Sequence, residues 1–198
     1  MFEGSQETWE AVLALLRPSP GDQVLDAGCG TGRLAIALAD LVGEAGQVAA
    51  VDVSPAMLRQ AKRQIDRTPF GQRIGLRQAD VRALPYPDGQ FDGAVASLVL
   101  ELLSPADVLA ALRELRRVVR PGGRLAVAAL AEETPVGRTV AFYLVLRRIL
   151  PLAALGRPLG LRRLAAEAGF LTRISMRRSL LRLPVDILIC EVPAPPQS

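Results

Sequence analysis

Three glycines at alternate positions follow an acid and an apolar run in residues 24–32, Val-Leu-Asp-Ala-Gly-Cys-Gly-Thr-Gly. The apolar run predicts a buried strand, and the glycines predict a tight turn from that strand into a helix. Because Gly28 and Gly30 lack a Cβ, they can adopt positive φ and let a ligand lie against bare backbone. Gly32 should allow the helix to pack closely on the strand. The segment therefore predicts a binding loop for a small-molecule cofactor.

The glycine spacing differs from the G-x-G-x-x-G pattern of dinucleotide-binding loops. The third glycine falls one residue early, and Arg33 stands where that pattern has a small residue. This difference disfavours NAD as the ligand. An NAD-dependent oxidoreductase stays open as the alternative enzyme class.

Two more acids end apolar runs further along the chain. Asp52 ends residues 47–52 and Asp80 follows residues 74–79. A carboxylate can accept hydrogen bonds from both hydroxyls of a ribose, as expected for Asp52, and Asp80 is placed to accept from an adenine amine. The carboxyl ends of parallel strands meet at one edge of a sheet, so these acids and Asp26 should outline one extended cofactor. Either of the later acids can instead cap the next helix or turn.

With these motifs the chain resembles the class I S-adenosylmethionine-dependent methyltransferases, and more closely the branch that includes the quinone-biosynthesis C-methyltransferases. The matching segments, in the family's order, are residues 24–32, 51–54, 78–81, 91–97 and 116–125. The resemblance implies S-adenosylmethionine as the cofactor and no metal, with Ser97 opposite the sulfonium. The cofactor-binding residues that it indicates are Asp26, Gly28, Gly30, Thr31, Asp52, Val53, Met57, Asp80, Val81 and Ser97. For Met57, packing against the adenine and simple core filling both remain open.

Apolar runs alternate with amphipathic segments along most of the chain, which predicts an α/β fold with parallel strands and right-handed crossovers. The expected strands are 23–27, 47–52, 74–79, 91–97, 123–130, 172–179 and 185–191. The expected helices are 6–17, 32–43, 55–67, 105–119 and 161–168. The resemblance implies a Rossmann-like, doubly wound sheet of seven strands with helices on both faces, mostly parallel, whose last strand is antiparallel.

Length and composition suit one domain over residues 1–198, with residues 1–20 contributing an N-terminal helix. The start of the chain lacks the charged and apolar regions of a secretory signal, which predicts a cytoplasmic protein. Cys29 and Cys190 are too few for a metal cluster or a disulfide framework. Histidine is absent, so imidazole metal sites and the commonest general base are excluded.

Glu101 is the acid nearest the expected methyl group, just past the fourth strand in an apolar stretch. The resemblance places it where relatives often carry histidine. Burial could raise its pKa and let it act as a base or orient the methyl acceptor, whereas pairing with an arginine is the structural alternative. Tyr143 is a second, weaker candidate.

Residues 131–160 depart most from the family pattern and lie between the fifth strand and the last helix. In this fold that position covers the acceptor pocket, so residues 137–155 are expected to form a helical lid with apolar residues on more than one side. The segment is too short to span a bilayer before Arg147 and Arg148. The family resemblance and the apolar lid together imply a small or lipid-like acceptor, such as a quinone precursor or a phospholipid.

The charge is uneven, because residues 138–198 carry 10 basic and 3 acidic side chains. Two contacts of the lid are therefore open: a peripheral contact with an anionic membrane, at the inner membrane surface, and a contact within a homodimer. With 4% aromatic residues and no reading motif, the chain is not expected to bind nucleic acid. The sequence thus predicts a methyltransferase, with a non-catalytic cofactor-binding module of the same fold as the non-enzyme alternative.

Overall fold

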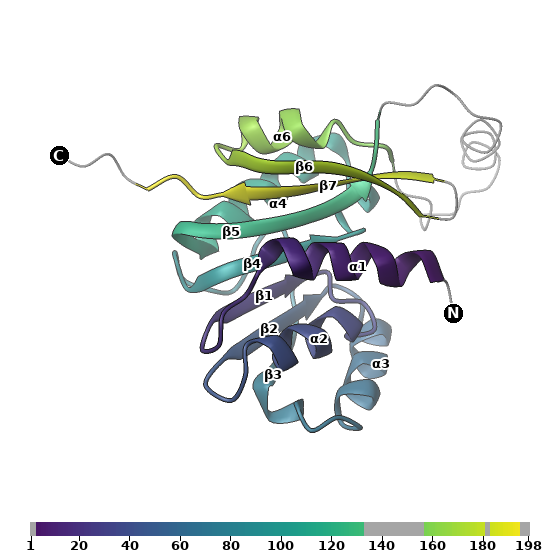
Figure 1. Ribbon diagram of the computed structural model, residues 1–198, viewed down its shortest axis with the longest axis vertical. Helices are drawn as coiled ribbons and strands as arrows, with labels where there is room; N and C mark the ends of the chain where they lie inside the picture. Colours follow the sequence, from purple (N-terminus) through teal and green to yellow (C-terminus); the bar gives the residue numbers. More distant parts are fainter. Residues whose placement is uncertain (1–2, 133–156, 181–182, 195–198) are drawn as a thin grey trace.

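The computed structural model describes residues 3–132, 157–180 and 183–194. Seven strands in these ranges form one sheet in the order β3-β2-β1-β4-β5-β7-β6 (Figure 1). The strands are β1 Gln23–Ala27, β2 Gln47–Asp52, β3 Ile74–Gln78, β4 Phe91–Ser97, β5 Val119–Leu130, β6 Leu171–Leu180 and β7 Leu183–Glu191. The α-helices are α1 Glu3–Leu16, α2 Arg33–Leu41, α3 Pro55–Ile65, α4 Pro105–Val118 and α6 Leu161–Glu167, with short 3-10 helices η1 Gly71–Arg73 and η2 Leu100–Leu102.

The direction of the strands confirms the predicted fold class. β1 pairs in parallel with β2 and β4, β2 with β3, and β4 with β5. β7 is antiparallel to both β5 and β6. The loops that follow β1, β2, β3 and β4 therefore gather at one edge of the sheet, where open α/β sheets bind their ligands.

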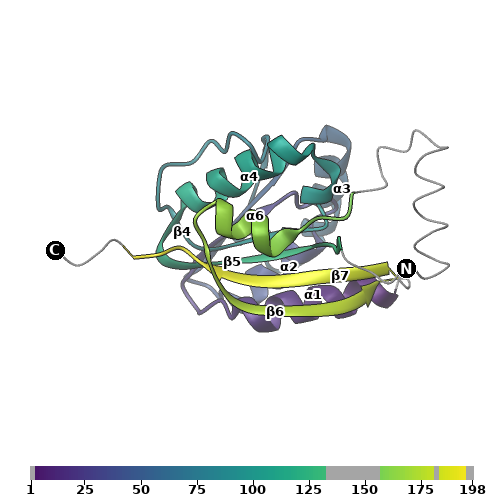
Figure 2. The same ribbon diagram turned by 90° about the horizontal axis from the view of Figure 1, so that it is seen from above.

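The helices lie on both faces of the sheet and bury two separate apolar cores (Figure 2). Residues of α4 and α6, such as Leu112 and Leu161, pack with Leu25 on one face. Residues of α1 and α2, such as Val12 and Leu38, pack on the other face, where Ala61 and Ile65 of α3 join them. The sheet is therefore covered on both faces, and the loops at its carboxyl edge extend beyond these two layers.

Local signals start the helices where the sequence predicts. Ser54 and Ser104 precede Pro55 and Pro105, and each serine Oγ accepts a backbone N–H three residues on. The hydroxyl satisfies a donor that the helix leaves free, and the proline fixes φ for the first turn. These caps set the start of α3 and α4 relative to the strand ends.

β5 begins earlier than predicted, directly after α4. Val119 already pairs with Phe91, and the register shifts before Gly93 pairs with Arg124. A Cβ at Gly123 would lie 2.7 Å from the Asp92 carbonyl oxygen, so this irregular stretch of strand requires a glycine there.

The predicted lid of residues 137–155, with Tyr143, Arg147 and Arg148, lies outside the described residues. The two chain segments that flank it are described and lie side by side. Leu159 N donates to the Leu130 carbonyl at 2.8 Å, and Glu132 N donates to the Leu159 carbonyl at 3.3 Å. Among the helices that the structure describes, none has the length and apolar character needed to cross a bilayer.

Gly32 allows α2 to approach α3, whereas the sequence suggested an approach to the preceding strand. Gly32 is the N-cap of α2 and has φ +81°. A Cβ there would lie 3.0 Å from the Ala61 Cβ and 3.4 Å from the Ile65 Cδ1. Close packing between the helices, together with the left-handed backbone, explains the glycine.

We predict that Gly32→Ala destabilises the protein more than Gly21→Ala does. Gly21 also has positive φ, but no atom lies within 4 Å of a Cβ built on it. Gly21→Ala should therefore cost only backbone strain, about 1 kcal/mol. Gly32→Ala adds crowding against α3 and should cost about 2 kcal/mol or more. Denaturant unfolding measures both values, and equal losses would contradict the packing role.

Candidate functional site

A cavity of about 410 Å³ lies at the carboxyl edge of the sheet, between the loops that follow β1, β2 and β4. Its lining residues are Trp9, Asp26, Gly28, Cys29, Gly30, Thr31, Arg33, Leu34, Asp52, Val53, Ser54, Met57, Ser97, Leu98, Val99 and Leu102. Eight of the ten residues predicted to bind the cofactor are in this set. The structure therefore brings together most of the predicted site, in a space large enough for a small ligand.

The glycine loop presents bare backbone to the cavity. Gly28 N and Cys29 N donate to the Val51 carbonyl at 2.8 and 2.9 Å, which fastens the loop to the end of β2. Gly30 has φ +53°, and a Cβ built there would meet no atom within 4 Å. At Gly28 a Cβ would collide with the Val99 side chain. The absence of side chains thus leaves room for a ligand at Gly30 and for the loop after β4 at Gly28.

Asp52 joins two of the loops through its carboxylate. Its Oδ2 accepts from Gly30 N and its Oδ1 accepts from Ser54 N, each at 2.8 Å. Each carboxylate oxygen has a second acceptor site, so the contacts leave capacity for ribose hydroxyls. Asp52 is consequently fixed in orientation before any ligand binds.

Asp26 is a buried acid in the same cavity. It is 1% exposed, and its Oδ2 has no hydrogen-bond partner. Burial raises the pKa of Asp26 to about 7, against the lowering effect of a hydrogen bond from the Ala35 amide, and the charge of Asp52 adds to the increase. The buried Ser97 Oγ also lacks a partner. Buried polar atoms without partners are costly, so a polar ligand that supplies a donor here fits the cavity.

Asp80 and Val81 are the two predicted cofactor residues outside the cavity lining. Asp80 Oδ2 pairs with the Arg82 guanidinium at 2.6 Å, which lowers the pKa of Asp80, and Arg82 also pairs with Asp107 at 2.8 Å. Val81 is buried in the core on the α4 side. Asp80 lies beyond β3 at the correct sheet edge, but an adenine amine would have to share it with Arg82.

Glu101 lies in η2, one residue from Leu102 of the cavity lining. It is 4% exposed, and its Oε2 has no partner. Burial raises the pKa of Glu101 to about 7, although hydrogen bonds from its own amide and the Leu130 amide lower it. Its carbonyl accepts from Arg157 N at 2.6 Å. No arginine of the described residues pairs with this carboxylate, in contrast to the alternative expected from the sequence.

Several lining residues are absent from the sequence motifs. Trp9 of α1 and Arg33 of α2 meet at the cavity, and their contact could not be predicted from spacing because α1 precedes the first strand. Leu102, which no motif includes, is 52% exposed although it is large and apolar, and the predicted residue Val53 is 65% exposed. Exposed apolar side chains beside a cavity are typical of a surface that packs against a ligand.

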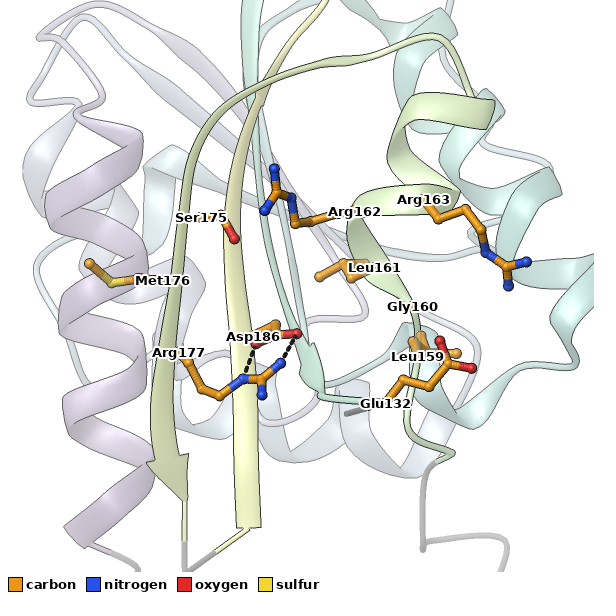
Figure 3. Close-up of a pocket in the computed structure, with 10 residues that line it drawn as sticks. All are labelled: Glu132, Leu159, Gly160, Leu161, Arg162, Arg163, Ser175, Met176, Arg177 and Asp186. Carbon is orange, nitrogen blue, oxygen red and sulfur yellow. Dashed lines mark hydrogen bonds and ion pairs between the residues drawn. The ribbon is translucent and has the colours of Figure 1, made fainter. Parts of the chain in front are cut away.

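A second cavity, of about 560 Å³, lies between α6 and the β6–β7 hairpin (Figure 3). Its charged lining residues are Glu132, Arg162, Arg163, Arg177 and Asp186, of which Arg177 and Asp186 form an ion pair at 2.7 Å. None of the predicted site residues lines it. The chemistry indicated by the sequence therefore belongs to the first cavity.

The cysteines and acids in the described part of the chain do not gather at a metal site. Cys29 and Cys190 are both buried and free, and burial raises the pKa of each thiol, to about 11 for Cys190. No group of three or more metal-ligating side chains occurs among the residues that the structure describes.

Comparison with known proteins identifies the family. Residues 24–123, half of the chain, match the model of the methyltransferase domain family. The matched range contains every predicted cofactor residue and Glu101. The chain therefore belongs to the methyltransferase domain family, and its seven-stranded fold is that of the class I S-adenosylmethionine-dependent methyltransferases, whose cofactor is S-adenosylmethionine.

Named relatives lie in the quinone-biosynthesis branch. A demethylmenaquinone methyltransferase of Desulfitobacterium hafniense is 33% identical over 153 residues, which are 77% of this chain and 60% of that protein. The ubiquinone/menaquinone biosynthesis C-methyltransferase UbiE of Hahella chejuensis is 40% identical over 114 residues, 58% of this chain and 45% of that protein. The chain thus spans less than two thirds of the length of these relatives.

The fold recurs in a solved structure of an S-adenosylmethionine-dependent methyltransferase from Aquifex aeolicus. That structure superimposes with a TM-score of 0.72 at 21% identity, over 96% of this chain and 90% of the other. At this identity the likeness establishes the fold alone.

We predict that Glu101→Gln stabilises the protein above pH 7. The pKa of Glu101 is raised from 4.5 to about 7 in the folded state, so the folded protein binds this proton more tightly than the unfolded chain does. Wild-type stability should therefore fall as pH rises from about 4.5 to about 7. The variant lacks this titration and should gain on the order of 2 kcal/mol over wild type at pH 8.

Denaturant unfolding at pH 5 and pH 8 measures the difference. Asp26 titrates in the same window in both proteins, so the comparison isolates Glu101. Glu167→Gln, at an exposed site on α6, is the control and should follow the wild type. A variant that is less stable than wild type at pH 8 would show that the Glu101 carboxylate is well solvated or paired.

Proposed function

We propose that this protein transfers the methyl group of S-adenosylmethionine to a ring carbon of a quinone precursor. The observation that carries the proposal is the cavity at the carboxyl edge of the sheet, which is lined by Asp26, whose Oδ2 has no hydrogen-bond partner, and by the bare backbone of Gly30. The names of the relatives support the acceptor class, since both act in menaquinone or ubiquinone biosynthesis.

The residues of the cavity are suited to hold the parts of this cofactor. Asp52, fixed by Gly30 N and Ser54 N, would accept from the ribose hydroxyls. Asp26 would accept from the ammonium group through its free Oδ2. Val53 and Met57 offer an apolar surface for the adenine, and Asp80 would share its carboxylate between Arg82 and the adenine amine. The predicted roles of Gly28, Thr31, Val81 and Ser97 belong to the same proposal.

The reaction needs positioning more than it needs a protein nucleophile. S-adenosylmethionine, when bound, supplies a methyl group that is activated by the positive sulfonium. The protein would hold the electron-rich ring of a reduced quinone precursor in line with this methyl group, and the ring carbon that gains the methyl group would give up its proton to a base. Holding the two reactants at contact distance supplies much of the rate enhancement. The residues that line the cavity would position the two reactants in this way.

The comparisons favour a quinone precursor over a phospholipid as the acceptor. Both named relatives carry quinone names, which support a quinone precursor as the acceptor. Membrane contact and dimerisation were expected from residues 137–155, which the structure does not describe, and neither forms part of this proposal.

The function is tested by calorimetric titration and a methyl-transfer assay. We expect the protein to bind S-adenosylmethionine and S-adenosylhomocysteine, and not NAD. We also expect it to transfer a labelled methyl group to a reduced demethylated naphthoquinone, because that ring is electron-rich at the unsubstituted carbon. Binding of NAD alone would favour the oxidoreductase. Cofactor binding without transfer to quinone or other small acceptors would indicate a non-catalytic module.

We further propose that Glu101 accepts the proton that the acceptor loses. A pKa of about 7 lets the carboxylate take a proton near neutral pH, and its Oε2 is free. The cavity residues Val99 and Leu102 flank it in sequence. Because Glu101 is only 4% exposed, transfer requires a bridging water or a small rotation of its side chain.

Glu101→Gln should lower the turnover number roughly 100-fold, the usual scale of general-base catalysis, and leave cofactor affinity unchanged. The rate–pH profile of wild type should rise through pH 7, and the variant should lose this limb. Since the variant is expected to fold at least as stably as wild type, a loss of rate is not a loss of folded protein. Equal turnover of the two proteins would exclude Glu101 as the base.

A further inference from the structure

Trp9 and Arg33 form a contact at the cofactor cavity that the cofactor motifs do not include. Trp9 belongs to α1 and Arg33 is the first residue of α2, and both line the cavity. The guanidinium carbon of Arg33 lies 6.0 Å from the centre of the Trp9 ring. At this distance the aromatic face attracts the cation. Trp9 therefore restrains a positive charge at the entrance to the cavity.

The Arg33 guanidinium has no carboxylate partner among the described residues. Among the described residues its side chain contacts Trp9, and it is otherwise exposed. Other arginines of the chain, such as Arg82 and Arg117, are ion-paired. Guanidinium groups bind carboxylates through two parallel N–H donors. Arg33 is thus available to an anionic group of a ligand in the cavity.

A buried acid, Asp26, lines the same cavity. Asp26 is 1% exposed, and its Oδ2 has no partner. This oxygen is an acceptor and suits an ammonium donor. The glycine loop runs between the two residues, with Gly30 open to the cavity. A ligand that satisfies both residues carries an ammonium and a carboxylate, as an α-amino acid does.

We propose that Arg33, oriented by Trp9, binds the carboxylate at the amino-acid end of S-adenosylmethionine, opposite the ammonium group held by Asp26. The inference rests on the proposed function and adds α1 to the cofactor site. Trp9 is a positioning residue, because it acts through Arg33. The pair would make recognition of the amino-acid end depend on the packing of α1 against the sheet.

The test compares S-adenosylhomocysteine with its decarboxylated analogue, which keeps the ammonium group and lacks the carboxylate. Calorimetric titration of both ligands is carried out on the wild type, Arg33→Ala and Arg33→Lys. Arg113→Ala is the matched control, since Arg113 is an exposed arginine on α4, which packs on the opposite face from α2. Thermal unfolding of each variant confirms that it is folded.

Arg33→Ala should weaken S-adenosylhomocysteine binding about tenfold, the loss of one charge-assisted contact, and leave the affinity for the analogue unchanged. The affinity of Arg33→Lys for S-adenosylhomocysteine should fall between those of the wild type and Arg33→Ala, because lysine keeps the charge but lacks the planar guanidinium. Trp9→Leu should weaken S-adenosylhomocysteine binding in the same selective way, and Trp9→Phe, which keeps an aromatic face, should restore most of it.

The two ligands separate the outcomes. If Arg33→Ala weakens the binding of both ligands equally, or weakens the binding of neither, the assignment of Arg33 is overturned while the proposed function stays intact. A wild-type protein that binds neither ligand would overturn the proposed function, and this inference with it. A selective loss in Arg113→Ala would also overturn the inference, since that residue lies on the other face.

Discussion

The Asp52 carboxylate is the contact on which the geometry of the site depends. It accepts from Gly30 N with one oxygen and from Ser54 N with the other, so it links the loop after β1 to the start of α3. Parallel pairing of β1 with β2 brings these loops to the same edge, but pairing alone does not fix their separation. The carboxylate fixes it. Each carboxylate oxygen accepts one loop amide and keeps a second acceptor site, so Asp52 can bind a ligand while it holds the two loops in place.

Most of the framework could be predicted from the sequence, because local signals specify it. The bounds of β1, β2 and β4 follow from apolar runs that end in polar residues, and the starts of α3 and α4 follow from Ser-Pro caps. Long-range side-chain contacts could not be predicted in this way. The pairing of Asp80 with Arg82 and the stacking of Arg33 on Trp9 depend on rotamers and on how separate elements pack. Gly32 shows the same limit, since its spacing predicted a close approach but not the partner, α3.

Asp26 and Glu101 are two buried acids near one cavity, but only Asp26 lines it. Both are buried, and burial raises the pKa of each to about 7. Asp26 lines the cavity directly, whereas Glu101 is not among the lining residues and accepts a hydrogen bond from the Leu130 amide at the end of β5. Buried acids without partners reduce stability, and such positions are frequent where a protein binds or reacts with a ligand. This difference in position supports the proposal that Asp26 binds the cofactor and that Glu101 takes part in the chemistry of the acceptor.

The parallel bridge between Ala131 and Leu159 has a consequence for how relatives of this protein can diverge. The bridge brings both ends of a long insertion to the same point beside β5, so the sheet does not depend on the length or composition of the chain between them. Closing a longer loop between fixed ends costs little additional entropy. Relatives can therefore differ in the length and composition of this one segment, while β5 and the loops after β1, β2 and β4 keep their arrangement.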